Sequence, residues 1–111
     1  MKHLVAIIQP QQLPAIKKAL HEANIEHMSC TNILGTIPNQ DEHQSFRGVE
    51  HEITLFQKVR LEFFINDESL EPVIEAISKG GQATGGTGKI FVSELQDCVS
   101  VSTGAHGPSE I

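Results

Sequence analysis

The chain has 111 residues, of which 39% are hydrophobic, and a formal net charge of −6. This length fits one domain, and the acidic balance argues against nucleic acid as a partner, because proteins that bind duplexes present a basic surface. No apolar run approaches the roughly 20 residues that a membrane-spanning helix needs, and Pro10 interrupts the apolar start, so we expect a cytoplasmic protein.

The first third of the chain predicts a strand, a helix and a second strand. Residues 4–8 form a short, branched apolar run, which is typical of a buried strand. Pro10 ends that run, and apolar residues then recur at helical spacing from Leu13 to Ala23. Residues 25–34 alternate weakly and predict the second strand, which Gly35 closes.

A long polar loop, residues 36–55, follows. It is acidic and poor in apolar spacing, and loops of this length in a small domain usually carry a function. We therefore expect a mobile, partner-binding loop. Its histidines and carboxylates match no closed metal site, so no metal site is predicted.

The second half repeats the strand–helix–strand order. Residues 58–65 alternate clearly between apolar and polar side chains, and a helix with an apolar face follows from Leu70 to Ile77. We expect Gly80 and Gly81 to stop that helix. A short strand is predicted at 90–92, and another strand in the C-terminal segment, residues 95–111, from the alternation at 98–102.

This order is β-α-β-β-α-β, the ferredoxin-like arrangement of an α+β domain. We therefore predict a single domain over residues 1–111, in which an antiparallel sheet carries two helices on one face. The other face stays open unless a second copy covers it, and a domain this small favours such an oligomer.

The glycine loop, residues 81–89, is the strongest local signal for binding. Glycines let backbone N–H groups approach an anion closely, and Lys89 adds a positive charge, so phosphate is the natural ligand. The alternative is a flexible connector without a ligand. The loop is not of the Walker type, because Ala83 stands at the first glycine and Ile90 follows the lysine. No acid–base pair or nucleophile signature is present, so we predict that the protein is not an enzyme.

Five stretches carry a resemblance to a known family, and they follow in order along nearly the whole chain: VAIIQP at 5–10, FRGVEHEI at 46–53, QKVRLEFF at 57–64, TGGTGKIFV at 84–92 and STGAHGPSEI at 102–111. In these stretches the chain resembles the PII signal-transduction proteins of nitrogen regulation. The resemblance implies a ferredoxin-like homotrimer that binds adenine nucleotide in the clefts between neighbouring subunits. The long loop would then be the T-loop, which docks onto a membrane transporter or a metabolic enzyme, and the protein would reach a membrane only through that partner.

The resemblance also implies roles for individual residues. The adenosine would contact Ile7, Met28, Ser29, Gly35 and Phe64. The phosphates would lie on Gly86, Thr87, Gly88 and Lys89. Glu62 would pair with the loop lysine of a neighbour, and Lys58 and Asn39 would hold 2-oxoglutarate beside magnesium.

Departures from the family pattern remove positive charge around the phosphates. Ser100 and Ser102 stand where the family has two arginines that reach the nucleotide phosphates, and Gln9 replaces a common lysine. Because each charge-assisted contact contributes roughly 1.5–3 kcal/mol, we expect ADP or AMP to be preferred over ATP. Asn39 is one methylene shorter than the usual glutamine, which argues against Mg²⁺ and 2-oxoglutarate. The alternative is a diverged trimer of the same fold that responds to a metal ion or another small ligand without nucleotide binding.

Overall fold

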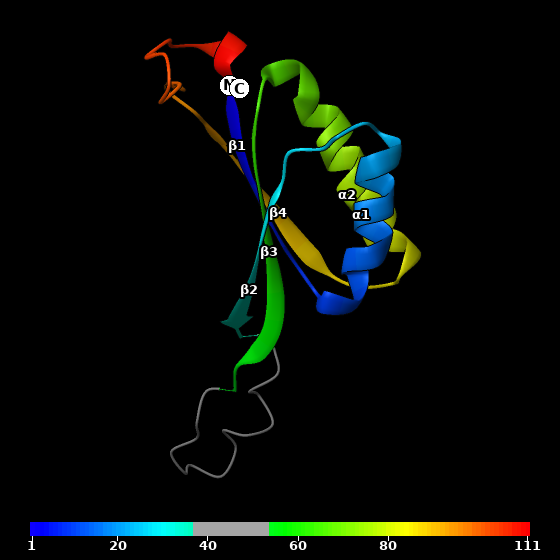
Figure 1. Ribbon diagram of the computed structural model, residues 1–111. Helices are drawn as coiled ribbons and strands as arrows, with labels where there is room; N and C mark the ends of the chain where they lie inside the picture. The colour runs from blue at the N-terminus through cyan, green and yellow to red at the C-terminus, as the bar shows by residue number, and fades with distance from the viewer. Residues whose placement is uncertain (37–53) are drawn as a thin grey trace.

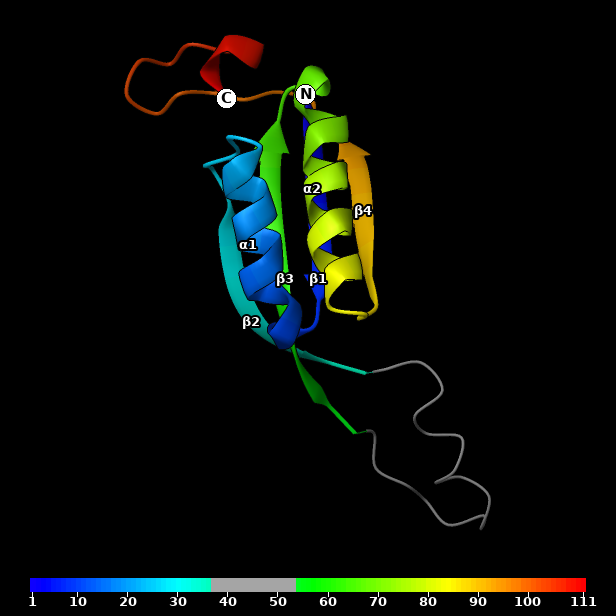
Figure 2. The same cartoon turned by 90° about the vertical axis from the view of Figure 1, so that its right-hand side faces the viewer.

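The computed structural model describes residues 1–36 and 54–111. The described part of the chain folds into one four-stranded sheet in the order β2-β3-β1-β4, with every neighbouring pair antiparallel. Both helices cover the same face of this sheet (Figures 1 and 2), so the predicted ferredoxin-like α+β fold is confirmed. The elements are β1 (Lys2–Ile8), α1 (Leu13–Glu22), β2 (Ser29–Gly35), β3 (Phe56–Ile65), α2 (Leu70–Ala83) and β4 (Gly88–Glu94).

The core lies between the helices and the two central strands. Alternate residues of a strand point to opposite faces of the sheet, so every second residue of β1 and β3 is buried against the helices. The largest fully buried side chain is Phe63, which is 1% exposed. Other core residues on the strands and helices are Leu4, Ala6, Ile8, Val59, Leu61, Ile16, Leu20, Val73 and Ile77.

The opposite side of the sheet, which we call the open face, has no helix on it among the described residues (Figure 1). The intervening residues of β1 and β3 lie there, Phe64 among them, and in β4 so does Phe91, which pairs with Val5. These two phenylalanines are 47% and 56% exposed. Exposed aromatic side chains on a sheet face that no described helix covers make the open face suited to contact with another protein surface.

Helix α2 continues through the two glycines that were predicted to stop it. A Cβ atom at Gly80 would lie 2.6 Å from the Cα atom of Ile16, so Gly80 lets α2 approach the backbone of α1. The helix ends at Ala83, and Gly85 supplies the left-handed conformation that follows it, with a φ of 67°. The prediction was therefore wrong about which glycine ends the helix.

Two further boundaries differ from the sequence prediction. Strand β2 begins at Ser29. Residues 23–25 instead cap the C-terminus of α1, because Asn24 adopts a φ of 61° and the Ile25 N–H donates to the Leu20 carbonyl at 2.9 Å. In the C-terminal segment the expected strand is reduced to a single bridge between Val99 and His106.

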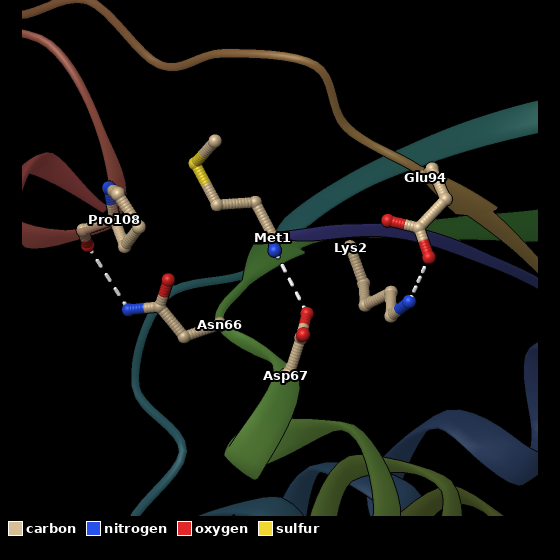
Figure 3. Close-up of polar contacts among 6 residues, drawn as sticks. All are labelled: Met1, Lys2, Asn66, Asp67, Glu94 and Pro108. Carbon is tan, nitrogen blue, oxygen red and sulfur yellow. Dashed lines mark hydrogen bonds and ion pairs between the residues drawn. The ribbon is translucent and has the colours of Figure 1, made fainter.

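Polar contacts join the start of β1 to its neighbours, and one of them holds the C-terminal segment at the end of β3 (Figure 3). The Asn66 side chain donates from Nδ2 to the Pro108 carbonyl at 3.0 Å, and the Met1 amine donates to Asp67 at 2.8 Å. Lys2 forms an ion pair with Glu94 on the neighbouring strand. This end of the sheet is the one opposite the glycine loop (Figures 1 and 2). In the described residues, no helix has the length and apolar character that crossing a membrane requires.

Candidate functional site

The glycine loop packs directly on the junction between β1 and α1. A Cβ atom at Gly86 would lie 2.4 Å from Nε2 of Gln12 and 2.8 Å from Oε1 of Gln9, and one at Gly88 would lie 2.8 Å from the carbonyl oxygen of Ile7. Real Cβ atoms essentially never come so close. Glycine is therefore required at Gly88, where the neighbour is backbone, whereas a side chain at Gly86 would displace the ends of Gln12 and Gln9. The glycines therefore serve close backbone approach, as the sequence indicates, and not flexibility alone.

A pocket of about 180 Å³ lies beside this loop. All four residues that were predicted to hold phosphates line it, namely Gly86, Thr87, Gly88 and Lys89, and Gln12 lines it as well. Lys89 is exposed, and it forms no ion pair with another described residue. Exposed N–H groups of a glycine-containing turn and a lysine are the groups that bind phosphate in many proteins.

The base of the long loop lies at the same end of the sheet. Gly35, at the end of β2, pairs with Phe56 at the start of β3. The Lys58 side chain runs past Gly35, and its Nζ donates to the Thr36 carbonyl at 2.7 Å. Ile7 pairs in register with Lys89 on the neighbouring strand. Gly35, Lys58 and Ile7 therefore share one end of the sheet with the phosphate-loop residues, whereas Asn39 lies outside the described residues.

Glu62 belongs to a different cluster, on the open face. Its Oε2 lies 2.7 Å from Nε2 of His3 and accepts a hydrogen bond from Nη2 of Arg60 at 3.0 Å. The hydrogen bond with His3 lowers the pKa of Glu62, burial opposes this, and the Arg60 charge adds to the lowering. The His3 ring stacks on Phe64, with ring centres 4.8 Å apart. Within one chain, the partners of Glu62 are thus His3 and Arg60; the pair with a neighbour's Lys89 stays a prediction.

The remaining predicted residues lie with this second cluster or beyond it. Ser29 pairs with Glu62 across β2 and β3, and Met28 packs partly buried against the core. Ser100 and Ser102 lie in the C-terminal segment, with their Oγ atoms 3.5 Å apart, and Val101 between them is fully exposed. That segment leaves the end of the sheet opposite the glycine loop (Figure 2).

One chain therefore presents two separate groups of site residues. The glycine-loop group comprises Ile7, Gly35, Lys58 and residues 86–89, and the open-face group comprises Ser29, Glu62 and Phe64. Met28 lies at the same end of the sheet as this second group but packs against the core, and Ser100 and Ser102 lie beyond it. Along β2, Gly35 and Ser29 are six residues apart, which is about 20 Å of strand. A ligand that contacts the first group and the C-terminal segment together must lie between two copies of the chain.

Two residues of the candidate site region, Gln12 and His3, were not predicted from the sequence. Gln12 is 2% exposed, which makes it the single buried polar side chain among residues 1–36 and 54–111. Its signal in the sequence is the Gln9–Gln12 spacing around Pro10, which matches a capping box. His3 could have been found from its place in a strand, on the same face as Phe64. Within the described ranges, no three metal-ligating side chains come together.

Comparison with known proteins finds relatives along nearly the whole chain. The sequence matches the family described as nitrogen regulatory protein P-II over residues 1–105. It is 33% identical to nitrogen regulatory protein GlnK1 of Methanosarcina mazei over an alignment that covers 100% of this chain and 97% of the relative. Nitrogen regulatory protein P-II 2 of Methanothermobacter thermautotrophicus is 37% identical, with the same coverage. Nitrogen regulatory protein P-II of Rhodospirillum rubrum is 35% identical, and the alignment covers 100% of both chains.

Proposed function

The chain belongs to the nitrogen regulatory protein P-II family, whose members are signal-transduction regulators and not enzymes, and from this premise we propose that it senses adenine nucleotides. In this proposal three copies assemble through their open faces. A nucleotide binds in each cleft between neighbours and alters the long loop, residues 36–55, which controls a partner transporter or metabolic enzyme. The protein acts in the cytoplasm and reaches a membrane only through that partner.

The observation that carries the proposal is the division of the site residues into two groups on one chain. The glycine-loop group can hold phosphates through its backbone and Lys89, but Ser100 and Ser102 lie beyond the other end of the sheet. A second copy whose C-terminal segment reaches the glycine loop would complete the site. The exposed Val101 and the half-exposed Phe64 and Phe91 are apolar groups that such an assembly would bury.

The charge at the site favours nucleotides with few phosphates. Lys89 is the cation of the glycine-loop pocket among the described residues, and Ser100 and Ser102 are neutral. Each cationic contact to a phosphate contributes roughly 1.5–3 kcal/mol, so two missing cations reduce the binding of the third phosphate most. We therefore propose that ADP or AMP is bound in preference to ATP, and that neither Mg²⁺ nor 2-oxoglutarate adds to the affinity.

A link from the site to the long loop is present at the base of that loop. Lys58 donates to the carbonyl of Thr36, the first residue of the loop, and the aliphatic part of the Lys58 side chain packs on Gly35. A ligand that draws Lys58 away removes this hydrogen bond. The ligand can shift the loop population only by the difference in its affinity for the two arrangements.

Calorimetric titration with AMP, ADP and ATP, each with and without Mg²⁺ and 2-oxoglutarate, tests the proposal. We expect tighter binding of ADP or AMP than of ATP, and no effect of 2-oxoglutarate. Lys89→Met should weaken ADP binding about tenfold or more. Lys79→Met, on the outer side of α2, should leave the affinity for ADP unchanged. If no nucleotide binds and a divalent metal raises the unfolding temperature instead, the nucleotide-sensing proposal is wrong and the metal-responsive alternative is favoured.

A further inference from the structure

We propose that Gln12 is a phosphate-recognition residue, and that its side-chain amide donates a hydrogen bond from Nε2 to a phosphate oxygen of the bound nucleotide. This inference rests on the proposed nucleotide site. It adds a neutral donor, supplied by the β1–α1 junction, to the backbone groups and the lysine of the glycine loop.

The orientation of the Gln12 amide is the first observation that supports this role. Oε1 of Gln12 accepts a hydrogen bond from the backbone N–H of Gln9 at 2.8 Å, which fixes that end of the amide. Nε2 must then lie on the opposite side, and there it meets the glycines: a Cβ atom would lie 2.4 Å from it at Gly86 and 3.4 Å from it at Gly81. The donor is thus held directly against the loop that lines the pocket.

The burial of the Gln12 side chain is the second observation. Gln12 is 2% exposed, yet Nε2 donates to no other described residue. The described side-chain atoms that are both sealed from solvent and unpaired are Arg60 Nε and Asn66 Oδ1, so Nε2 of Gln12, a residue that lines the pocket, keeps a small accessible surface. In the free protein water can accept its hydrogen bond, and a phosphate oxygen in the pocket would replace that water as the acceptor.

The chemistry of the pocket explains why a neutral donor is useful there. Ile8, Ile16 and Ile77 form its apolar side. An amide N–H offers a hydrogen bond to phosphate in these surroundings without the desolvation cost of a second ammonium group.

The test compares adenosine, AMP and ADP as ligands of three variants by calorimetry at pH 8. Gln12→Glu keeps Oε1 and the side-chain shape but replaces the donor by an oxygen, and Gln12→Met removes the donor without adding charge. Gln11→Met is the matched control, because Gln11 is the neighbouring glutamine, is exposed and does not line the pocket. We expect both Gln12 variants to bind ADP about tenfold or more weakly, and to bind adenosine within about twofold of the unmodified protein.

Three outcomes would overturn the inference: unchanged ADP affinity in both Gln12 variants, an equal loss for adenosine and ADP, or the same loss in Gln11→Met. An equal loss for adenosine would mean that Gln12 only supports the fold around the loop, and thermal unfolding of each variant checks this directly. Failure of the unmodified protein to bind ADP or AMP would refute the proposed function itself. Binding by the unmodified protein with normal Gln12 variants would refute only the role of Gln12.

Discussion

Alanine at Gly80 and alanine at Gly81 are expected to have different effects on stability, although the two glycines are neighbours in α2. Alanine is the better helix former by up to about 1 kcal/mol at either position. At Gly81 the new methyl group meets only Nε2 of Gln12, at 3.4 Å. At Gly80 it would lie 2.6 Å from Cα and 2.7 Å from N of Ile16, and these backbone atoms cannot rotate away.

The shared gain in helix propensity cancels when the two variants are compared, so their difference isolates the clash. Overpacking of this kind costs about 1–3 kcal/mol, and we expect Gly80→Ala to be less stable than Gly81→Ala by that amount. For a domain of this size the difference in melting temperature is about 4–12 °C. Thermal unfolding at one fixed protein concentration measures it, since assembly of copies makes the transition concentration-dependent. Equal melting temperatures would refute the argument that Gly80 sets the approach of α2 to α1.

Three further predictions concern the site and the open face. Phe64→Ala should weaken self-association by about 2 kcal/mol or more while leaving the circular dichroism of each copy unchanged, which light scattering after size-exclusion chromatography would show; a variant that associates normally would place the interface elsewhere. Because His3 holds the pKa of Glu62 below its usual value, the stability that Glu62 adds is present above the unfolded-state pKa and is lost as the pH falls through the lower pKa of the folded protein. Glu62→Gln should therefore reduce the stability lost between about pH 5 and pH 3, and an unchanged acid unfolding curve would contradict this. Gly86→Ala should weaken ADP binding about tenfold or more, because its methyl group would displace Gln12. An unchanged affinity for ADP by calorimetry would count against a preformed loop.

The sequence predicted the fold well where one local pattern decides the structure. The alternation in residues 58–65 identified β3 and also its buried face, since a strand has a side-chain period of two. By the same rule Phe64, which follows the buried Phe63, belongs to the opposite face of the sheet, and the structure shows it there. The glycines around Lys89 also form a local signal, and the structure brings Gly86, Thr87, Gly88 and Lys89 to one pocket, while their role in binding phosphate stays a prediction.

The sequence could not predict features that depend on distant partners. Gly80 and Gly81 look like a helix stop, and only the approach of Ile16, 64 residues earlier in the chain, shows why glycine is needed inside the helix. Gln12 reads as a surface residue until the glycine loop covers it. The separation of the site residues into two groups could be seen only once the sheet was known, because Gly35 and Ser29 belong to one strand but lie at different ends of the sheet.

The central position of β1 has a consequence for how the chain folds as it is synthesised. Both ladder partners of β1 come late: β3 ends at Ile65 and β4 at Glu94, 57 and 86 residues after Ile8. At synthesis rates of about 5–20 residues per second, the apolar first strand leaves the ribosome about 3–12 s before the first complete partner is made. Only sequence-distant pairings complete the sheet, which makes its formation slow compared with that of either helix. During that interval β1 is exposed to chaperones and to other nascent chains, so substitutions that make residues 2–8 more aggregation-prone should reduce the yield of folded protein more than its final stability.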